Sequence, residues 1–214
     1  MNNTNQIIEF IKEIENLKSV TRTAWTKTGR RESTAEHSWR LSMLLMLLEE
    51  DFKDVDINKA IKMSLVHDLG ELYDGDISAK LQSEDDNKSY MEERAMRRML
   101  TILPKSLSGK IYDLWKEYNE CSTKEAKLVK AMDKLETIVR HNQGKNPDDF
   151  DYKFNLQYGK QYFEDNDILK IMRNIIDEDT KLSISLNHIW IKYKTIILLK
   201  YGIKICYLQQ KKRD

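Results

Sequence analysis

Leu65-Val66-His67-Asp68-Leu69-Gly70-Glu71, followed by Asp74-Gly75-Asp76, is the stretch from which the rest of the chain can be interpreted. It closes a run from Ile57 to Leu72 in which apolar residues recur every three or four positions, which predicts an amphipathic helix. An imidazole and a carboxylate stand side by side near the end of that helix. Burying such a pair is costly unless both groups find partners. A divalent metal ion would satisfy both, provided that other parts of the chain supply further ligands.

Composition favours a helical protein. The chain has 214 residues, 33% of them charged, with only 7 Gly and 2 Pro, which predicts an all-α fold of one domain or one domain with an appendage. The net charge of +1 supplies no field that would attract nucleic acid, and none is expected as a partner.

Other features of the sequence bear on location. Two distant cysteines, Cys121 and Cys206, form no CxxC pair. The first ten residues lack a basic and apolar leader, and no apolar run approaches the roughly 20 residues of a membrane span. We therefore expect a reduced, cytoplasmic protein without a transmembrane segment.

Helices are predicted on both sides of the opening stretch. Apolar periodicity indicates them at about 7–17, 35–48, 90–103, 107–118, 124–141 and 167–177. Ser33 or Thr34 can cap the second of these, Asp56 the helix at 57–72, and Ser122 or Thr123 the helix that begins at 124. Two segments lack a helical pattern. Residues 18–34 are predicted to be an irregular basic loop, and residues 83–89 a polar, mobile segment.

The chain changes character at Leu182. Residues 182–214 interleave large apolar side chains with lysines, so we divide the protein into a main domain, 1–181, and a C-terminal extension, 182–214. The extension could be a final helix that covers the core or a dimer interface, and we favour this. It could instead bind a membrane surface or a partner.

Several His and Asp residues form a candidate metal site. Two imidazoles and two carboxylates suit a borderline-hard divalent ion such as Mn, Fe, Co, Ni or Zn. The absence of cysteine from the set argues against a structural zinc site. Seen alone, His37 could be a hydrogen-bonding partner, and Asp133 could pair with Lys130 or Lys134 at the surface. The set is His37, His67, Asp68 and Asp133.

Further polar residues suggest a substrate site beside this metal. Glu71 follows His67 by four residues, so on a helix it projects on the same side and could orient a water or move a proton. Asp76, on the following turn, could reach a ligand hydroxyl. The alternatives are a solvated helix end and a simple turn residue. The early loop carries three arginines that could bind a phosphate group together, Arg22, Arg30 and Arg31. The alternative is that this loop is only a solvated connection.

The order of these residues resembles that of the HD superfamily of metal-dependent phosphohydrolases. Three blocks also resemble its 5′-deoxynucleotidase subfamily, and the resemblance covers roughly Ile7 to Asp179. The blocks are Arg31-Glu32-Ser33-Thr34-Ala35-Glu36-His37-Ser38, His67-Asp68-Leu69-Gly70-Glu71 with Gly75-Asp76, and Lys127-Leu128-Val129-Lys130-Ala131-Met132-Asp133-Lys134-Leu135-Glu136.

This resemblance implies a helical HD-domain bundle, usually a homodimer, that holds one divalent transition metal. It makes Glu71 the catalytic acidic residue, Asp76 the group that meets the sugar hydroxyl, and Arg22 a phosphate contact. The implied reaction is hydrolysis of a deoxyribonucleoside 5′-monophosphate to deoxynucleoside and phosphate. The implied metal ligands are His37, His67, Asp68 and Asp133.

One departure bears on the substrate. In the bacterial nucleotidases of the subfamily an aromatic residue directly follows the arginine and helps to exclude a ribose 2′-hydroxyl. Here Thr23 follows Arg22, and Trp25 comes two positions later, as in the eukaryotic-like relatives. The sequence thus leaves open the choice between deoxyribose and ribose. Ribonucleotides, nucleoside triphosphates and alarmones stay as other candidate substrates, and a membrane- or partner-binding protein that acts through its tail is the alternative of another class.

Overall fold

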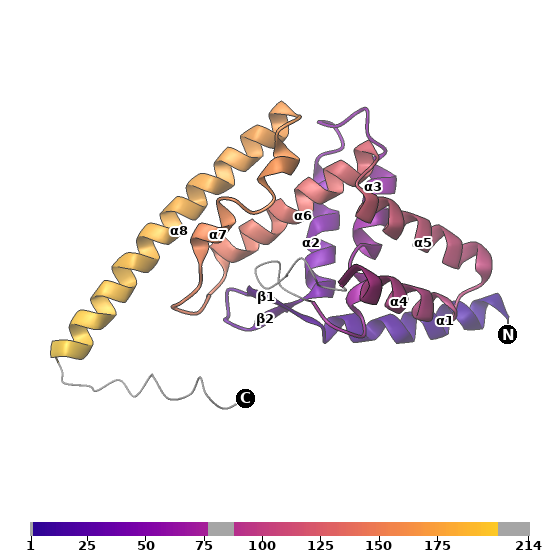
Figure 1. Ribbon diagram of the computed structural model, residues 1–214, viewed down its shortest axis with the longest axis horizontal. Coiled ribbons are helices and arrows are strands. Elements are labelled where there is room, and N and C mark those ends of the chain that lie inside the picture. Colours follow the sequence, from indigo (N-terminus) through magenta and orange to yellow (C-terminus); the bar gives the residue numbers. More distant parts are fainter. Residues whose placement is uncertain (1, 77–87, 201–214) are drawn as a thin grey trace.

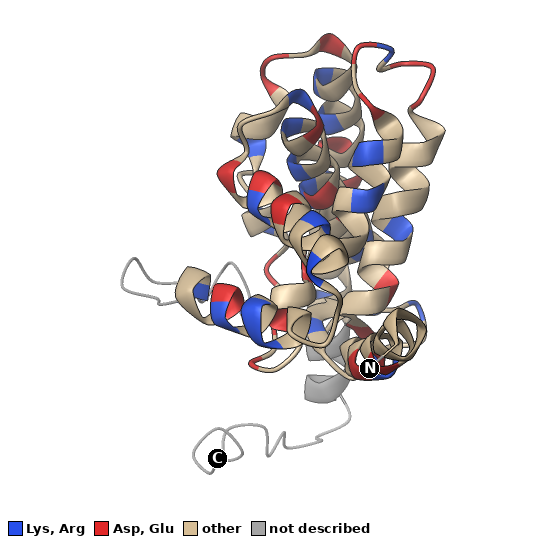
Figure 2. Cartoon of the chain, turned by 90° about the vertical axis from the view of Figure 1, so that its right-hand side faces the viewer, with Lys and Arg blue, Asp and Glu red and all other residues tan. Residues whose placement is uncertain are grey.

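The computed structural model describes residues 2–76 and 88–200, with residues 194–200 as helical backbone only. Within them the fold is mainly helical, with one small sheet, as the sequence predicted (Figure 1). Lysines and arginines are interspersed with acidic residues over the helices (Figure 2). The elements are α1 Asn3–Ile14, η1 Glu15–Lys18, β1 Thr21–Trp25, β2 Arg31–Ser33, α2 Thr34–Leu47, α3 Ile57–Val66, η2 Leu69–Glu71, α4 Lys88–Leu100, α5 Lys105–Glu120, α6 Lys124–Gln143, α7 Tyr152–Asn155, η3 Lys160–Phe163 and α8 Asp167–Lys200.

Polar side chains begin three of these helices where the sequence predicted caps. Ser33 precedes α2 and forms a capping box with Glu36, in which each side chain accepts the other residue's backbone N–H. The side chains of Asp56 and Thr123 each accept a backbone N–H three residues further on, at the starts of α3 and α6. These bonds satisfy amide groups that have no partner inside the helix.

Residues 18–34 contain a β-hairpin, so the prediction of an irregular loop was wrong. β1 pairs with β2 in antiparallel fashion, with Thr21 opposite Ser33 and Trp25 opposite Arg31. Strands of five and three residues are too short to show a reliable alternation in the sequence. The hairpin packs against α6 and so places β1 next to the helix that carries Asp133.

The helix predicted over 57–72 is broken at His67. α3 ends at Val66, the backbone of Asp68 leaves the helical region at φ −102° and ψ 8°, and the short 3-10 turn η2 follows. The apolar spacing continues through the break because the side chains on both sides of it are buried, although in different places.

Two apolar cores meet at this break. Ala60 and Met63 of α3 belong to a core built with α2, α5, α6 and α8. Leu69 and Leu72 belong to a second core built with α1, η1, α4 and α5. His67 and its neighbour Asp68 therefore lie at the junction of the two cores. A polar pair at such a junction faces neither apolar interior.

Gly70 allows η2 to lie directly against α4. A Cβ atom at this position would be 2.9 Å from the Cβ of Glu92 and 3.1 Å from its carbonyl oxygen. Both distances are shorter than ordinary packing permits, so a residue with a side chain would push the two elements apart. The glycine of the opening stretch is thus explained by close packing.

α8 is much longer than the predicted helix at 167–177, because no Gly or Pro interrupts it before Lys200. Its first half packs on α6, which lies in the middle of the molecule (Figure 1). Between residues 182 and 193 its large side chains are mostly exposed, and Leu182 and Trp190 are 59% and 55% accessible. This described part of the extension is a final helix, as we favoured, but it does not cover the core of its own chain, and its role at a dimer interface stays a prediction.

The boundary between the main domain and the extension stays a prediction, because α8 crosses it without interruption. Residues 201–214 lie outside the described residues, as does most of the segment 83–89 that was predicted to be mobile; Lys88 and Ser89 belong to α4. Of the helices that the structure describes, none has the length and apolar character needed to cross a bilayer.

Candidate metal centre and substrate pocket

Three parts of the fold bring the four predicted ligands to one point. α2 supplies His37, the turn between α3 and η2 supplies His67 and Asp68, and α6 supplies Asp133. The Nε2 atom of His37 is 3.1 Å from Oδ1 of Asp133 and 3.9 Å from Oδ2 of Asp68. The Nε2 atom of His67 is 3.0 Å from the same Asp68 oxygen. Residues from distant parts of the sequence thus form one compact set.

Hydrogen bonds decide which ring nitrogens face this point. The Nδ1–H group of His67 donates to the carbonyl oxygen of Ser64 at 2.8 Å, and Nδ1 of His37 contacts the carboxylate of Glu136. Both Nε2 atoms are thereby turned toward the aspartates. Nε2 of His67 is buried without a hydrogen-bond partner. A lone pair that faces carboxylate oxygens calls for a cation, so these residues fit a divalent metal ion.

Asp133 is held by two donors on its other oxygen. The hydroxyl group of Tyr118 donates to Oδ2 at 2.7 Å and the ammonium group of Lys134 at 2.9 Å. Burial alone would raise the pKa of Asp133, but the Lys134 charge and the hydrogen bond with His37 hold it well below its usual range. The carboxylate is therefore ionised and its Oδ1 atom is directed at the histidines.

Neighbouring charges also change the pKa of His37. Burial and the Arg22 charge would lower its pKa, but Glu136 and Asp133 outweigh them and raise it to about 9. A cation, whether proton or metal, is thus favoured at this ring.

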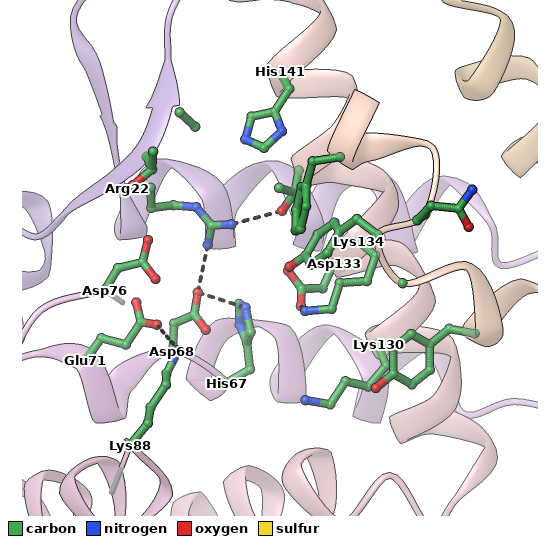
Figure 3. Close-up of a pocket in the computed structure, with 18 of the residues that line it drawn as sticks. Arg22, His67, Asp68, Glu71, Asp76, Lys88, Lys130, Asp133, Lys134 and His141 are labelled. Atoms are coloured by element: carbon green, nitrogen blue, oxygen red, sulfur yellow. Dashed lines mark hydrogen bonds and ion pairs between the residues drawn. The ribbon is translucent and has the colours of Figure 1, made fainter. Parts of the chain in front are cut away.

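Arg22 of β1 reaches the site from the hairpin. Its Nη1 is 3.2 Å from Oδ2 of Asp68, and its Nη2 donates to the hydroxyl oxygen of Thr137 at 2.9 Å (Figure 3). Burial opposes ionisation of Asp68, but His67 and Arg22 lower its pKa below the usual range. The guanidinium group therefore lies beside the metal ligands, where a phosphate oxygen would also be found.

Glu71 lies on η2 at the edge of the same cluster. It is only 4% exposed, accepts a hydrogen bond from the Thr34 hydroxyl at 3.4 Å, and has the Lys88 ammonium 3.6 Å away. Burial raises the pKa of Glu71 to about 10, and the charges of Asp68 and Asp76 add to this rise. A carboxyl group so easily protonated, beside a candidate metal site, is suited to carrying a proton.

A pocket of about 790 Å³ opens over these residues. It is within the range of small-molecule sites. Beyond the metal ligands, part of its wall is aromatic. The Trp25 and Phe150 rings are 5.9 Å apart edge to face, and Phe150 and His141 are 4.9 Å apart. Asp76 lines the pocket on the Glu71 side (Figure 3).

The structure does not bring Arg30 and Arg31 into the pocket. Arg30 forms an exposed ion pair with Glu36, in which its Nη1 donates at 2.8 Å. The Nε–H group of Arg31 donates to the backbone carbonyl of Arg22 at 3.0 Å, across the hairpin. These contacts within and beside the hairpin hold both side chains outside the pocket. Of the three arginines that the sequence suggested for phosphate binding, only Arg22 lines the pocket.

Comparison with known proteins places this arrangement in a family. A family model described as "HD domain" matches residues 14–172. The chain belongs to the HD-domain family. The 5′-deoxynucleotidase HDDC2 of Dictyostelium discoideum is 37% identical over 159 residues, which cover 70% of this chain and 84% of that protein. The human protein of the same name is 32% identical over 139 residues, covering 64% and 67%.

Solved structures share this HD-domain fold. A protein described as a predicted metal-dependent phosphohydrolase, from Magnetospirillum magnetotacticum, superposes with a TM-score of 0.70 at 22% identity, covering 86% of this chain and 97% of its own. A conserved hypothetical protein from Pyrococcus furiosus gives 0.57 at 29% identity, covering 81% and 99%. The first likeness concerns the fold alone. The resemblance inferred from the sequence motifs is confirmed at the level of the family.

A second acidic cluster lies behind His37 in this HD domain. Glu32 and Glu136 are 2% and 3% exposed, and with His37 they could also hold an ion by proximity alone. However, Nη1 of Arg40 lies 2.8 Å from Oε1 of Glu136, and Nη1 of Arg140 lies 4.0 Å from Oε1 of Glu32. Two guanidinium groups thus balance two carboxylates, which makes this cluster an ion-pair network.

Sequence reasoning missed the part played by Glu136. Its carboxylate fixes the orientation of the His37 ring, as carboxylates commonly do for metal-binding histidines. One signal was available. Glu136 follows Asp133 by three residues on a helix, so both lie on the same face of α6. Tyr118 carried no such signal, because it comes from a different helix, α5.

Proposed function

We propose that this protein is a metal-dependent 5′-deoxynucleotidase, which hydrolyses deoxyribonucleoside 5′-monophosphates to a deoxynucleoside and phosphate. One observation carries the proposal: the convergence of two histidines and two aspartates beside Glu71, at the base of a pocket large enough for a nucleotide. The names of the similar HD-domain proteins support the same reaction.

The metal ligands in this proposal are His37, His67, Asp68 and Asp133, and the ion is one of Mn, Co, Fe, Ni or Zn. These metals accept mixed imidazole and carboxylate ligands. When bound, such an ion polarises a phosphoryl oxygen and lowers the pKa of water.

The side chains around the ligands complete the reaction. In its ionised form, which the charge of a bound metal ion would favour, Glu71 orients the attacking water and accepts its proton, while Arg22 offsets the negative charge that builds up on the phosphoryl oxygens. A P–O bond forms to the water oxygen as the bond from phosphorus to the 5′-oxygen breaks. The proton held by Glu71 then passes to the leaving 5′-oxygen, so the carboxyl group ends the cycle as it began.

We assign the sugar to Asp76 and Trp25, which line the pocket beside these groups. The carboxylate of Asp76 would accept a hydrogen bond from a sugar hydroxyl, and the ring of Trp25 would limit the room on the sugar's other side. The proposal also includes a homodimer in the cytoplasm, in keeping with the resemblance and with the cysteine content.

The test uses metal-stripped protein. Mn, Co, Zn or Mg is added back separately, and phosphate release is followed from matched deoxyribo- and ribonucleoside 5′-monophosphates. We expect a transition metal to restore turnover on the deoxynucleotides, with Asp68→Asn as the inactive control. Equal turnover of deoxyribo- and ribonucleotides would support a phosphohydrolase but contradict its selectivity for deoxyribose. Tight metal binding without turnover on any monophosphate would contradict the proposal.

A further inference from the structure

The pocket is lined by several cationic side chains, and most of them are paired with carboxylates. Arg22 lies 3.2 Å from Asp68, and Lys134 lies 2.9 Å from Asp133. Lys88 is 3.3 Å from Glu92 and 3.6 Å from Glu71. Their charges are therefore largely committed to the protein's own acidic groups.

Lys130 differs from these three. Its ammonium nitrogen lies 3.6 Å from the centroid of the Tyr118 ring, and among the residues that the structure describes no carboxylate oxygen lies within 4.0 Å of it. It precedes Asp133 by three residues on α6, so it lines the same pocket one turn away from a metal ligand. An aromatic face compensates a cation only partly.

The surroundings of Lys130 make this shortage of negative charge costly. Burial lowers its pKa, the neighbouring Lys134 charge lowers it further, and Asp133 and Asp68 offset only part of this. A partly desolvated ammonium group with no counter-ion gains most from an anion that arrives with the ligand.

We propose that Lys130 is a phosphate-binding residue, whose ammonium group contacts the phosphoryl oxygens of the substrate from the α6 side, across the metal ligands from Arg22. The close-up shows these two cations on opposite sides of His67 and Asp68 (Figure 3). The inference rests on the proposed function and adds a substrate contact that the sequence motifs do not assign. Arg22 already pairs with Asp68 and donates to Thr137, whereas Lys130 has no ion pair to break among the residues that the structure describes.

A purely structural role for Lys130 has different consequences. Its contact with Tyr118 could serve only to hold that ring, whose hydroxyl group donates to Asp133. Loss of Lys130 would then weaken the binding of the metal and leave the affinity for phosphate unchanged. The two roles can be separated by measuring the two affinities independently.

The experiment compares Lys130→Met and Lys130→Gln with the unaltered protein and with Lys127→Met. Lys127 is exposed on the same helix and does not line the pocket, so it serves as the matched control. Mn²⁺ affinity is measured by titration, and inorganic phosphate affinity by calorimetry on the Mn-loaded protein. The KM for a deoxynucleoside monophosphate is measured in parallel.

We expect either Lys130 substitution to weaken phosphate binding and raise KM by roughly tenfold or more, with Mn²⁺ affinity within about twofold of the unaltered protein. Lys130→Arg should recover part of the loss, and Lys127→Met should change neither value. Unchanged phosphate affinity in a folded Lys130 variant would overturn the inference, with or without a change in metal affinity. Phosphate binding needs no turnover, so failure of the proposed function would be recognised separately, as an unaltered protein that binds phosphate but hydrolyses no monophosphate.

Discussion

His37 stands between two buried clusters with similar composition and opposite character. On the pocket side its Nε2 atom and that of His67 face the oxygens of Asp133 and Asp68, and the Nε2 atom of His67 has no hydrogen-bond partner there. On the far side its Nδ1 atom faces Glu136, whose other oxygen lies 2.8 Å from Arg40. Carboxylates on that side face guanidinium groups, so donors face acceptors.

The difference teaches how to tell a ligand site from an internal ion-pair network. Proximity of His, Asp and Glu does not suffice, because both clusters meet that criterion. The informative feature is which buried atoms lack a partner, and whether they would attract a positive charge. In the far cluster the buried atoms without a hydrogen-bond partner include both carboxylate oxygens and guanidinium nitrogens, whose charges offset one another, whereas in the pocket cluster the unpartnered atom is Nε2 of His67. Only the pocket cluster gains from an added ion.

The largest expected effect comes from breaking the pocket cluster. Asp133→Asn should weaken metal binding by more than about 100-fold, because even residues that merely orient ligands are worth 10–100-fold. Phosphatase activity should fall to background. Metal titration and phosphate release measure the two effects, with circular dichroism as the control for folding. Undiminished metal binding would remove Asp133 from the ligand set.

Glu71→Gln should separate chemistry from metal binding. We expect kcat to fall by roughly 10²–10⁴-fold, the range for loss of a group that transfers protons. Metal affinity should change little, because the Glu71 carboxylate lies outside the ligand set. A variant that kept most of its turnover would show that another group moves the proton.

The same variant should change how stability depends on pH. The raised pKa of Glu71 means that the folded protein holds a proton that the unfolded chain releases above about pH 4.3. In the metal-free protein, stability should therefore fall as pH rises from there toward 10, by about 1.4 kcal/mol per pH unit, or about 4 kcal/mol between pH 5 and pH 8. Urea unfolding at both pH values should show a smaller fall for Glu71→Gln. Parallel pH profiles for the two proteins would contradict the assignment.

On the far side of His37, Glu136→Gln should weaken metal binding by about 10–100-fold without abolishing it, because the ring loses its orienting carboxylate and keeps its Nε2 atom. The optical spectrum of the Co²⁺-loaded protein should change with it, which a loss of general stability would not cause. An unaltered spectrum and affinity would show that the far cluster is independent of the metal site.

The smallest effect is expected at Arg30. Arg30→Ala removes an exposed ion pair with Glu36, outside the pocket. KM and kcat should change by less than about twofold, since exposed ion pairs contribute little. A tenfold rise in KM would restore the arginine to the phosphate site that the sequence first suggested.

Much of the site could be predicted from the sequence because its residues follow a fixed order. His37, the His67-Asp68 pair and Asp133 were identified without any knowledge of their geometry, and the structure brings them together. The helical fold class followed from the scarcity of Gly and Pro and from apolar periodicity.

Other features depended on contacts that a sequence pattern does not record. Arg22 and Arg30 look equivalent in the sequence, and only the pairing of two short strands gives one of them access to the pocket. Glu136 and Lys130 lie among other charged residues of α6, where their roles depend on which face of the helix is buried. The break at His67 was hidden because apolar spacing continues into a second core.

Gly70 has a consequence for how the pocket can change. The backbone of η2 lies so close to Glu92 that a Cβ atom at position 70 would come within 2.9 Å of it. Nothing compressible separates the turn that carries Glu71 from the helix that carries Lys88. The acidic group and this part of the wall must therefore move as one mechanical unit. A change in the position of α4 that reshaped the pocket would also move Glu71. Because Gly70 has no Cβ atom, the substrate range and the catalytic rate are therefore coupled.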